Sequence, residues 1–185
     1  MRRNQTLNRG LILLLGGSLA VGLASWTAPS IAQENEAQGS GDDANDPAFA
    51  QKFWDYLKKA DFQEEWSRWP GHDEGFMEGR SPHGAFLKVY VNEQVTGNLE
   101  NPPVESIIVK ENYNEQKELV AITPMYRVGK DYDPEHNDWY WAKYKPDGTL
   151  FEMKGMKLSG KVQGCINCHS SAKGKDYVFT NDSTN

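Results

Sequence analysis

Both cysteines of this chain lie in one short segment. The segment reads Cys165-Ile166-Asn167-Cys168-His169, so two thiols stand three positions apart and a histidine follows the second. On one helical turn, thiols at this spacing can form thioether bonds to the two vinyl groups of a porphyrin, and the adjacent imidazole can bind the iron. The spacing predicts one covalent haem c, with Cys165 and Cys168 as attachment points and His169 as the metal ligand.

The same residues have three other chemical uses in proteins. A redox dithiol needs no following histidine, and no β-α-β pattern precedes the segment. Half of a zinc site is disfavoured because structural zinc usually takes four ligands, and the chain has no second cysteine pair. A disulfide is permitted in an exported protein. The metal and disulfide interpretations stay open, and haem attachment is the favoured one.

The N-terminus has the layout of a secretory signal peptide. Arginines precede an apolar run over 11–24, and Ser30-Ile31-Ala32 provides small residues for cleavage after Ala32. The run has fourteen residues, fewer than the roughly 20 that a bilayer span needs. We therefore expect residues 1–32 to be removed by the Sec route, leaving a periplasmic or secreted protein with no membrane insertion. Haem is covalently loaded outside the cytoplasm, so the two predictions support each other.

The net negative charge of the chain limits the classes of molecule that it can bind. The 185 residues carry 20 basic and 26 acidic groups, and without residues 1–32 the net charge becomes −9. Nucleic acid is therefore an unsuitable partner. Residues 33–46 contain five acids, no base and no large apolar side chain, which predicts an acidic flexible linker. The negative net charge of the chain without residues 1–32 favours a basic redox partner protein.

Residues 47–185 form the predicted domain. Asp46-Pro47 and the spacing of Phe49, Phe53 and Leu57 predict a helix over about 47–59, and 61–69 extends it or forms a second short helix. Apolar alternation predicts strands near 85–91, 107–109, 119–128 and 139–144, and the Pro146-Asp147-Gly148 turn predicts that 149–153 pairs back as a fifth. The predicted class is α+β, a mainly antiparallel sheet with an N-terminal helix and a C-terminal haem-attachment helix.

Beyond the haem motif, the order of segments resembles the cytochrome P-460 family, which includes the beta-type cytochromes c-prime. The matching segments are 107–111 (IIVKE), Asn137-Asp138-Trp139, the motif itself and 176–180 (DYVFT). The resemblance covers most of the predicted domain and implies a sheet-rich c-haem protein with an open distal position on the iron.

The resemblance also implies a choice between two activities. Cytochromes P-460 carry a lysine cross-link to the porphyrin and oxidise hydroxylamine, whereas their beta-type relatives lack it and bind gases such as nitric oxide and carbon monoxide. Lys110 matches the cross-linking position, although a lysine on an alternating strand is usually solvated. We therefore expect a small nitrogenous or gaseous ligand, a hydroxylamine oxidoreductase activity as one possibility, and a homodimer at the level of the family.

The residue that occupies the sixth iron position decides between these functions and a plain electron carrier. Met153 and Met156 precede the haem segment and are the leading candidates, and the others are Met77, Met125, His72, His83 and His136. Glu152 and Glu111 are candidate proton acceptors, with Glu152 proposed as catalytic beside Lys110. Phe86, Tyr90, Trp139 and Trp141 are candidates for an aromatic distal wall. The alternatives are a six-coordinate electron-transfer cytochrome and a gas scavenger without turnover.

Overall fold

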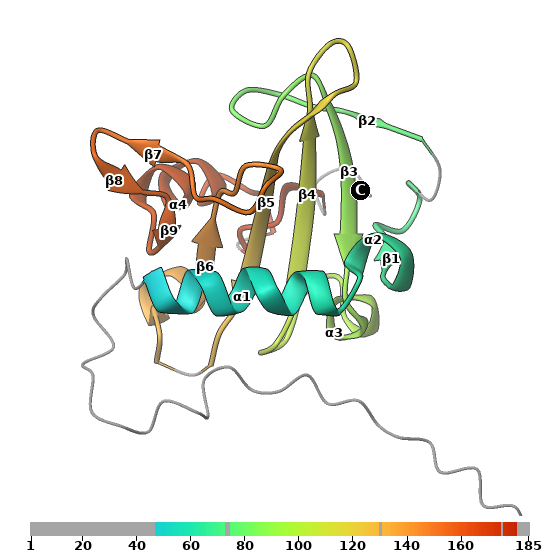
Figure 1. The fold of residues 1–185 in the computed structure, drawn as a ribbon. Coiled ribbons are helices and arrows are strands. Elements are labelled where there is room, and N and C mark those ends of the chain that lie inside the picture. Colours follow the sequence, from blue (N-terminus) through green and yellow to red (C-terminus); the bar gives the residue numbers. More distant parts are fainter. Residues whose placement is uncertain (1–46, 73–74, 130, 175, 181–185) are drawn as a thin grey trace, which may run out of the picture.

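A computed structural model describes residues 47–72, 75–129, 131–174 and 176–180 of the chain (Figure 1). The predicted signal peptide (1–32) and linker (33–46) lie outside these residues. The helices are α1 (Pro47–Lys59), α2 (Phe62–Glu65), α3 (Glu93–Gly97), the 3-10 helix η2 (Pro134–His136) and α4 (Gln163–His169). The strands are β1 (Ser67–Arg68), β2 (Met77–Glu78), β3 (Phe86–Val91), β4 (Ile107–Tyr113), β5 (Leu119–Arg127), β6 (Trp139–Ala142), β7 (Glu152–Met153), β8 (Met156–Lys157) and β9 (Ser159–Gly160).

The main sheet has the strand order β1-β3-β4-β5-β6-β9, with β2 also pairing with β3. Every strand pair in it is antiparallel, and β4 at its centre pairs with β3 on one side and β5 on the other. The predicted α+β class with a mainly antiparallel sheet is therefore confirmed. The strands pair mostly with their neighbours in sequence, as hairpin-connected strands do.

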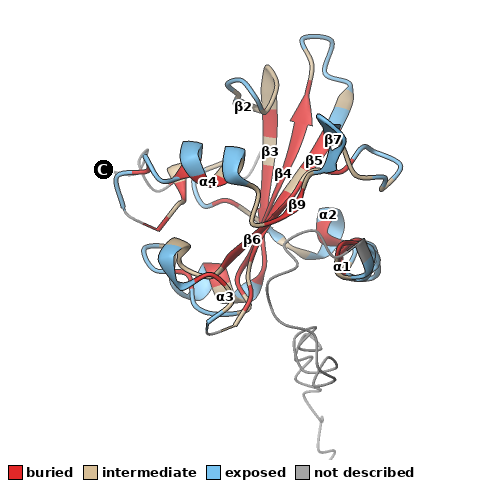
Figure 2. Cartoon of the chain, turned by 90° about the vertical axis from the view of Figure 1, so that its left-hand side faces the viewer, coloured by how far each residue is buried: buried red, intermediate tan, exposed pale blue. Residues whose placement is uncertain are grey.

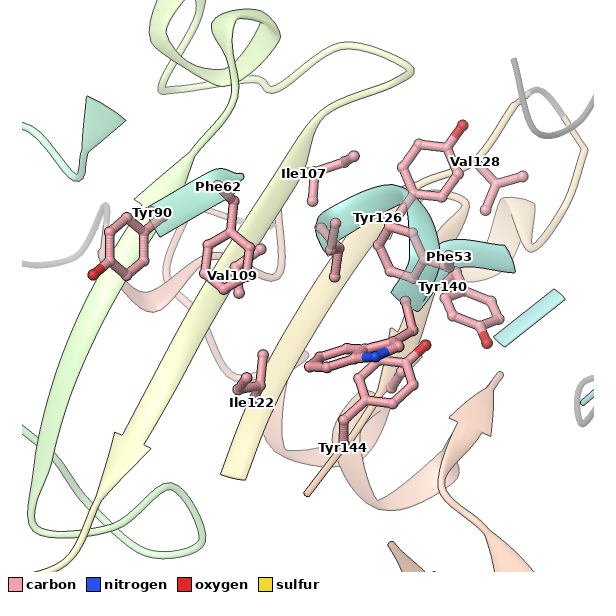
Figure 3. Packing of buried hydrophobic residues seen from close by; sticks show 13 residues of the cluster. Phe53, Phe62, Tyr90, Ile107, Val109, Ile122, Tyr126, Val128, Tyr140 and Tyr144 are labelled. Carbon is pink, nitrogen blue, oxygen red and sulfur yellow. The ribbon is translucent and has the colours of Figure 1, made fainter. Parts of the chain in front are cut away.

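Each face of the sheet contributes to its own cluster of buried side chains. Successive residues of a strand point to opposite faces, so Val109 of β4 belongs to one cluster and Ile108 to the other. Helix α1 covers the first face and α4 the second, and Figure 2 shows them on opposite sides of the sheet. The cluster under α1 is rich in aromatic rings (Figure 3).

Helix α1 packs against the sheet through the aromatic and leucine side chains on one of its sides. Phe53 and Leu57 are completely buried, and the Phe53 ring lies 5.4 Å from Tyr126 and 5.8 Å from Tyr140. The Tyr144 hydroxyl donates a hydrogen bond of 2.8 Å to the Ala50 carbonyl, which ties the helix to the sheet. None of the helices in the described ranges is long and apolar enough to span a membrane.

The C-terminal part of the sheet differs from the prediction. Leu150 does pair back on Tyr144, but Glu152 and Met153 continue into a separate two-stranded hairpin with Met156 and Lys157. The edge partner of β6 is instead the short strand β9. A two-residue strand has no readable period, because it is defined by hydrogen bonds to a distant segment rather than by its own pattern.

Candidate haem-binding site

A cavity of about 240 Å³ lies between the second face of the sheet and α4. Its walls come from the 82–83 loop, from β4, β5 and β6, from the β7–β8 hairpin, and from α4. The bordering residues are Pro82, His83, Lys110, Thr123, Pro124, Met125, Trp141, Ala142, Lys143, Met153, Leu158, Val162, Gly164, Cys165, Cys168 and His169. Most of this lining is apolar, as in sites that bind a large planar organic group.

Helix α4 presents the predicted motif to this cavity. Ile166 is buried in the cluster beneath the helix and anchors it, whereas Cys165 and Cys168 border the cavity as free thiols. The two thiols are therefore not joined to each other in this structure. In the described part of the chain, no group of three or more His, Cys, Asp or Glu side chains is placed to hold a metal ion.

The His169 ring has its protonation state set by one backbone contact. Its Nδ1 lies 2.7 Å from the Tyr177 carbonyl oxygen, which can only accept, so Nδ1 carries the proton. The lone pair is then on Nε2, the atom needed to bind an iron. Burial, helped by the positive charge of Lys110, lowers the pKa of His169 to about 4, which keeps the ring neutral at pH 7.

Aromatic rings enclose His169. The Trp141 ring centroid lies 4.7 Å from that of His169, and the Phe179 centroid lies at 5.2 Å. Of the four aromatic residues proposed for a distal wall, Trp141 alone borders the cavity. The other three lie elsewhere: Phe86 packs on Phe76, Tyr90 belongs to the cluster under α1, and the indole of Trp139 donates to the Asp176 carbonyl.

His83 approaches the cavity from the loop before β3, and its orientation is fixed by Asn112. The Nδ1 atom of His83 is 3.0 Å from the Asn112 side-chain oxygen. The Asn112 amide nitrogen donates to the Lys110 and Ala121 carbonyls at 3.0 Å each, and to the Thr123 hydroxyl at the same distance. Those acceptors settle which end of the amide faces His83, so His83 carries its proton on Nδ1 and its lone pair on Nε2.

The His83 loop is held against β4 by a close backbone approach at Gly84. This glycine has a φ of 104°, and a Cβ atom there would lie 2.6 Å from the Tyr113 carbonyl oxygen. The same carbonyl accepts a hydrogen bond of 2.9 Å from the amide of Ala85. A larger residue at position 84 would therefore push His83 away from Asn112.

Lys110 is a buried cation in the wall of the cavity. Its side chain is 7% exposed, and within the described residues no hydrogen bond or ion pair involves its ammonium group. Burial lowers the pKa of Lys110 to about 8, opposed in part by the Cys168 thiol nearby. The structure therefore brings Lys110 together with Cys165, Cys168 and His169, and its placement is the opposite of a solvated outward lysine.

The candidate sixth ligands divide into two groups. Met125, Met153 and His83 border the cavity, with the His83 ring centroid 5.9 Å from that of His169. Four candidates do not border it: Met77, Met156, His72 and His136. His136 is paired with Asp133 at 2.9 Å, and Met156 is 60% exposed.

Neither acidic candidate reaches the cavity. Glu111 is completely buried on the face of β4 that α1 covers, where it accepts hydrogen bonds from Gln63, Tyr90 and Tyr113. The hypothesis that Glu111 acts as a proton acceptor at the haem is wrong, because strand alternation points it away from Lys110. Glu152 is exposed and lines a different groove, beside Trp54, so the structure does not bring it together with Lys110. In β7 the same alternation turns Met153 toward the cavity in place of Glu152.

A comparison with protein families assigns the chain to one of them. A family model described as Cytochrome P460 matches residues 63–180. The chain belongs to the cytochrome P460 family. No curated protein and no solved structure matches the chain in the corresponding comparisons. Membership of the cytochrome P460 family implies haem binding.

The residues present fit the haem that a cytochrome P460 binds. Two free thiols and an unprotonated imidazole nitrogen lie on one side of an apolar cavity, which is the donor set for covalent attachment and iron ligation. The indole N–H of Trp141 is buried beside them without a hydrogen-bond partner in the described part of the chain. A ligand in the cavity can supply the acceptor that this donor lacks.

Two residues that hold the site were missed from the sequence. Asn112 and Thr123 have no motif of their own, and only Asn112 could have been placed from the sequence. Asn112 stands two residues after Lys110, and continuing the strand predicted near 107–109 through both residues places them on the same face. Thr123 pairs with Lys110 across β4 and β5, a register that only the folded sheet provides.

Proposed function

We propose that this chain is an extracytoplasmic mono-haem cytochrome P460 with an open sixth position on the iron, where hydroxylamine or nitric oxide binds or is oxidised. The observation that carries the proposal is the convergence of Lys110 and the Cys165-to-His169 motif on one apolar cavity. The signal-peptide pattern of residues 1–32 supports the extracytoplasmic location.

When bound, the haem supplies an iron that takes up the ligand and its electrons. Cys165 and Cys168 would hold it through thioether bonds, and Nε2 of His169 would bind the iron from α4. Lys110 has a pKa of about 8, so roughly a tenth of its amine is neutral at pH 7. A neutral amine is a nucleophile, which the protonated ammonium is not.

His83, rather than Glu111 or Glu152, is the candidate proton acceptor in this proposal. With Nδ1 donating to Asn112, its Nε2 is an unprotonated acceptor on a residue that borders the cavity. Burial and the charge of Lys110 lower the pKa of His83 to about 3. At pH 7 His83 is therefore a hydrogen-bond acceptor for a polar ligand and a weak base.

The test is the absorption spectrum of the haem-loaded protein, oxidised and reduced, with and without carbon monoxide. Lys110→Ala is compared with Lys88→Ala, a matched change on the neighbouring strand β3. Lys88 stands opposite Glu111 in the β3–β4 register, and its ammonium lies over the Phe76 and Tyr113 rings, away from the cavity.

A strongly red-shifted reduced Soret band that is lost in Lys110→Ala alone would support a lysine cross-link and hydroxylamine oxidation. An ordinary Soret band that shifts with carbon monoxide would support gas binding without the link. A reduced spectrum that carbon monoxide does not change would refute the open sixth position.

That last outcome corresponds to a second candidate function, a six-coordinate electron carrier. The structure favours His83 over Met153 or Met156 as its sixth ligand, because the His83 ring lies 5.9 Å from the His169 ring and is held in place by Asn112. Carbon monoxide binding by His83→Ala but not by the parent protein would establish this function.

A further inference from the structure

Positive charge is concentrated in the part of the chain that surrounds the haem motif. Residues 143–175 contain seven lysines and only two acids, although the whole chain has a net charge of −6. The remaining residues are therefore strongly acidic. A segment of this kind can give the surface around it a local potential opposite in sign to the net charge.

The structure places the start of this segment at the cavity. Among the residues that border the cavity, Lys110 and Lys143 are basic and none is acidic. The β7–β8 hairpin stands beside it, with Met153 in the wall and Lys154 at the turn. Figure 1 shows the hairpin and α4 together at the same end of the sheet.

The same hairpin exposes apolar surface. Met153 and Met156 lie opposite each other in the register and are 52% and 60% exposed, the two most exposed large hydrophobic side chains in the described residues. Lys154 and Lys157 flank them and are also exposed. Flexible methionines ringed by charge are typical of a surface that packs against a partner protein.

We infer that the β7–β8 hairpin, with Met153, Lys154, Met156 and Lys157, is the docking surface for an acidic electron-transfer protein. The inference rests on the proposed function, because a haem that oxidises a ligand must pass its electrons on. One electron at a time would leave the reduced iron and reduce the partner, an acidic protein in its oxidised form. Cys168 and Met153 both border the cavity and are exposed to solvent.

The partner's charge follows from the local surface and differs from the expectation based on net charge. A basic partner would be attracted by the acidic remainder of the chain but repelled at the cavity. Association is steered by the charges within about 8–10 Å of the contact at physiological salt, because more distant charges are screened. The lysines beside the cavity therefore decide the partner class.

Two charge-reversal variants of the haem-loaded full chain test this. Lys154→Glu/Lys157→Glu reverses the hairpin, and Lys52→Glu/Lys59→Glu makes the same net change on α1, where both lysines are exposed. Neither control lysine borders the cavity, and neither borders the groove beside Trp54 that Lys157 helps to line. Stopped-flow rates are measured from the reduced protein to anionic hexacyanoferrate(III) and to cationic tris(phenanthroline)cobalt(III), at low and high salt.

The hairpin variant is expected to react about tenfold more slowly with the anionic complex and faster with the cationic one at low salt. Both effects should disappear at high salt, and the α1 variant should stay within about twofold of the parent. Equal responses of the two variants, or no response in either, would overturn the inference.

A second readout needs no electron transfer. Carbodiimide joins lysine amines to carboxylates, so an acidic [2Fe–2S] ferredoxin used as the probe should be cross-linked at Lys154 and Lys157. Cross-links confined to lysines of α1, or stronger association with a basic cytochrome c than with the ferredoxin, would overturn the inference. A chain that carries no covalent haem would instead refute the proposed function. The pyridine haemochrome spectrum detects covalent haem, so it shows whether the proposed function or the docking inference has failed.

Discussion

Replacement of Asn112 by alanine is expected to weaken both the sheet and the hold on His83. Asn112 is 1% exposed and its amide makes four hydrogen bonds of 3.0 Å, three as a donor and one as the acceptor from His83. The Asn112 amide thereby joins β4, β5 and the His83 loop, and the Thr123 hydroxyl adds longer contacts of 3.3 Å to the Lys110 carbonyl and to Nδ1 of His83. Alanine leaves the Ala121 carbonyl short of a partner, and it leaves the Nδ1–H of His83 only the longer contact of 3.3 Å with the Thr123 hydroxyl.

The magnitude follows from those two groups. A buried polar group that loses its partner costs about 1–3 kcal/mol, so we expect Asn112→Ala to lower the free energy of unfolding by about 2–4 kcal/mol. This is a large part of the about 5–15 kcal/mol that a domain has in total, but it leaves the protein folded. His83→Ala should couple to it by about 1 kcal/mol, because the two residues share one network.

Urea unfolding followed by far-ultraviolet circular dichroism measures these free energies for the single and double variants. Asn101→Ala is the matched control, since Asn101 is exposed and its side-chain oxygen accepts only a long bond of 3.3 Å from Arg127. The control should change stability by less than about 0.5 kcal/mol.

A loss below about 1 kcal/mol for Asn112→Ala would refute the bonding scheme, and so would additivity with His83→Ala. In either case the proton assignment on His83 would lose its basis, and with it the role of Nε2 as an acceptor for a ligand.

Three further predictions concern buried titratable groups. Glu111→Ala should cost about 3 kcal/mol in urea unfolding, because it leaves two phenols and an amide without their acceptor, and it should leave the haem spectrum unchanged. Lys110→Met should stabilise the haem-free chain by about 1–3 kcal/mol at pH 7, because burial disfavours the ammonium. This gain should shrink as pH rises from about 8 to 10.5, where the unfolded lysine also becomes neutral; a gain that does not change with pH would contradict the cause. Burial raises the pKa of Tyr90 and Tyr126 to about 12, so their contribution to stability is complete below pH 10 and is lost between pH 10 and 12, as the unfolded state deprotonates first. Urea midpoints across that range, with absorbance at 295 nm, check the loss, and ionisation of both tyrosines near pH 10 in the folded protein would exclude it.

The local pattern of the chain predicted much of the site. The spacing of Cys165, Cys168 and His169 reports the chemistry directly, because neighbouring residues on one helical turn are close in any fold. Alternation over 107–113 likewise determines that Lys110 and Glu111 face opposite sides of a strand. What alternation cannot tell is which side holds the cavity, and Glu111 was misplaced for that reason.

Tertiary structure decided the rest, because it depends on contacts between segments far apart in the chain. His83 is 29 residues from Asn112, so its proton position depends on a loop folding back onto β4. The Met153 side chain borders the cavity and Glu152 does not because β7 leaves the main sheet and pairs with β8, while β9 takes the edge beside β6. Sequence thus determined which groups are available and how neighbours alternate, and the packing of α1 and α4 on opposite faces determined which of those groups meet.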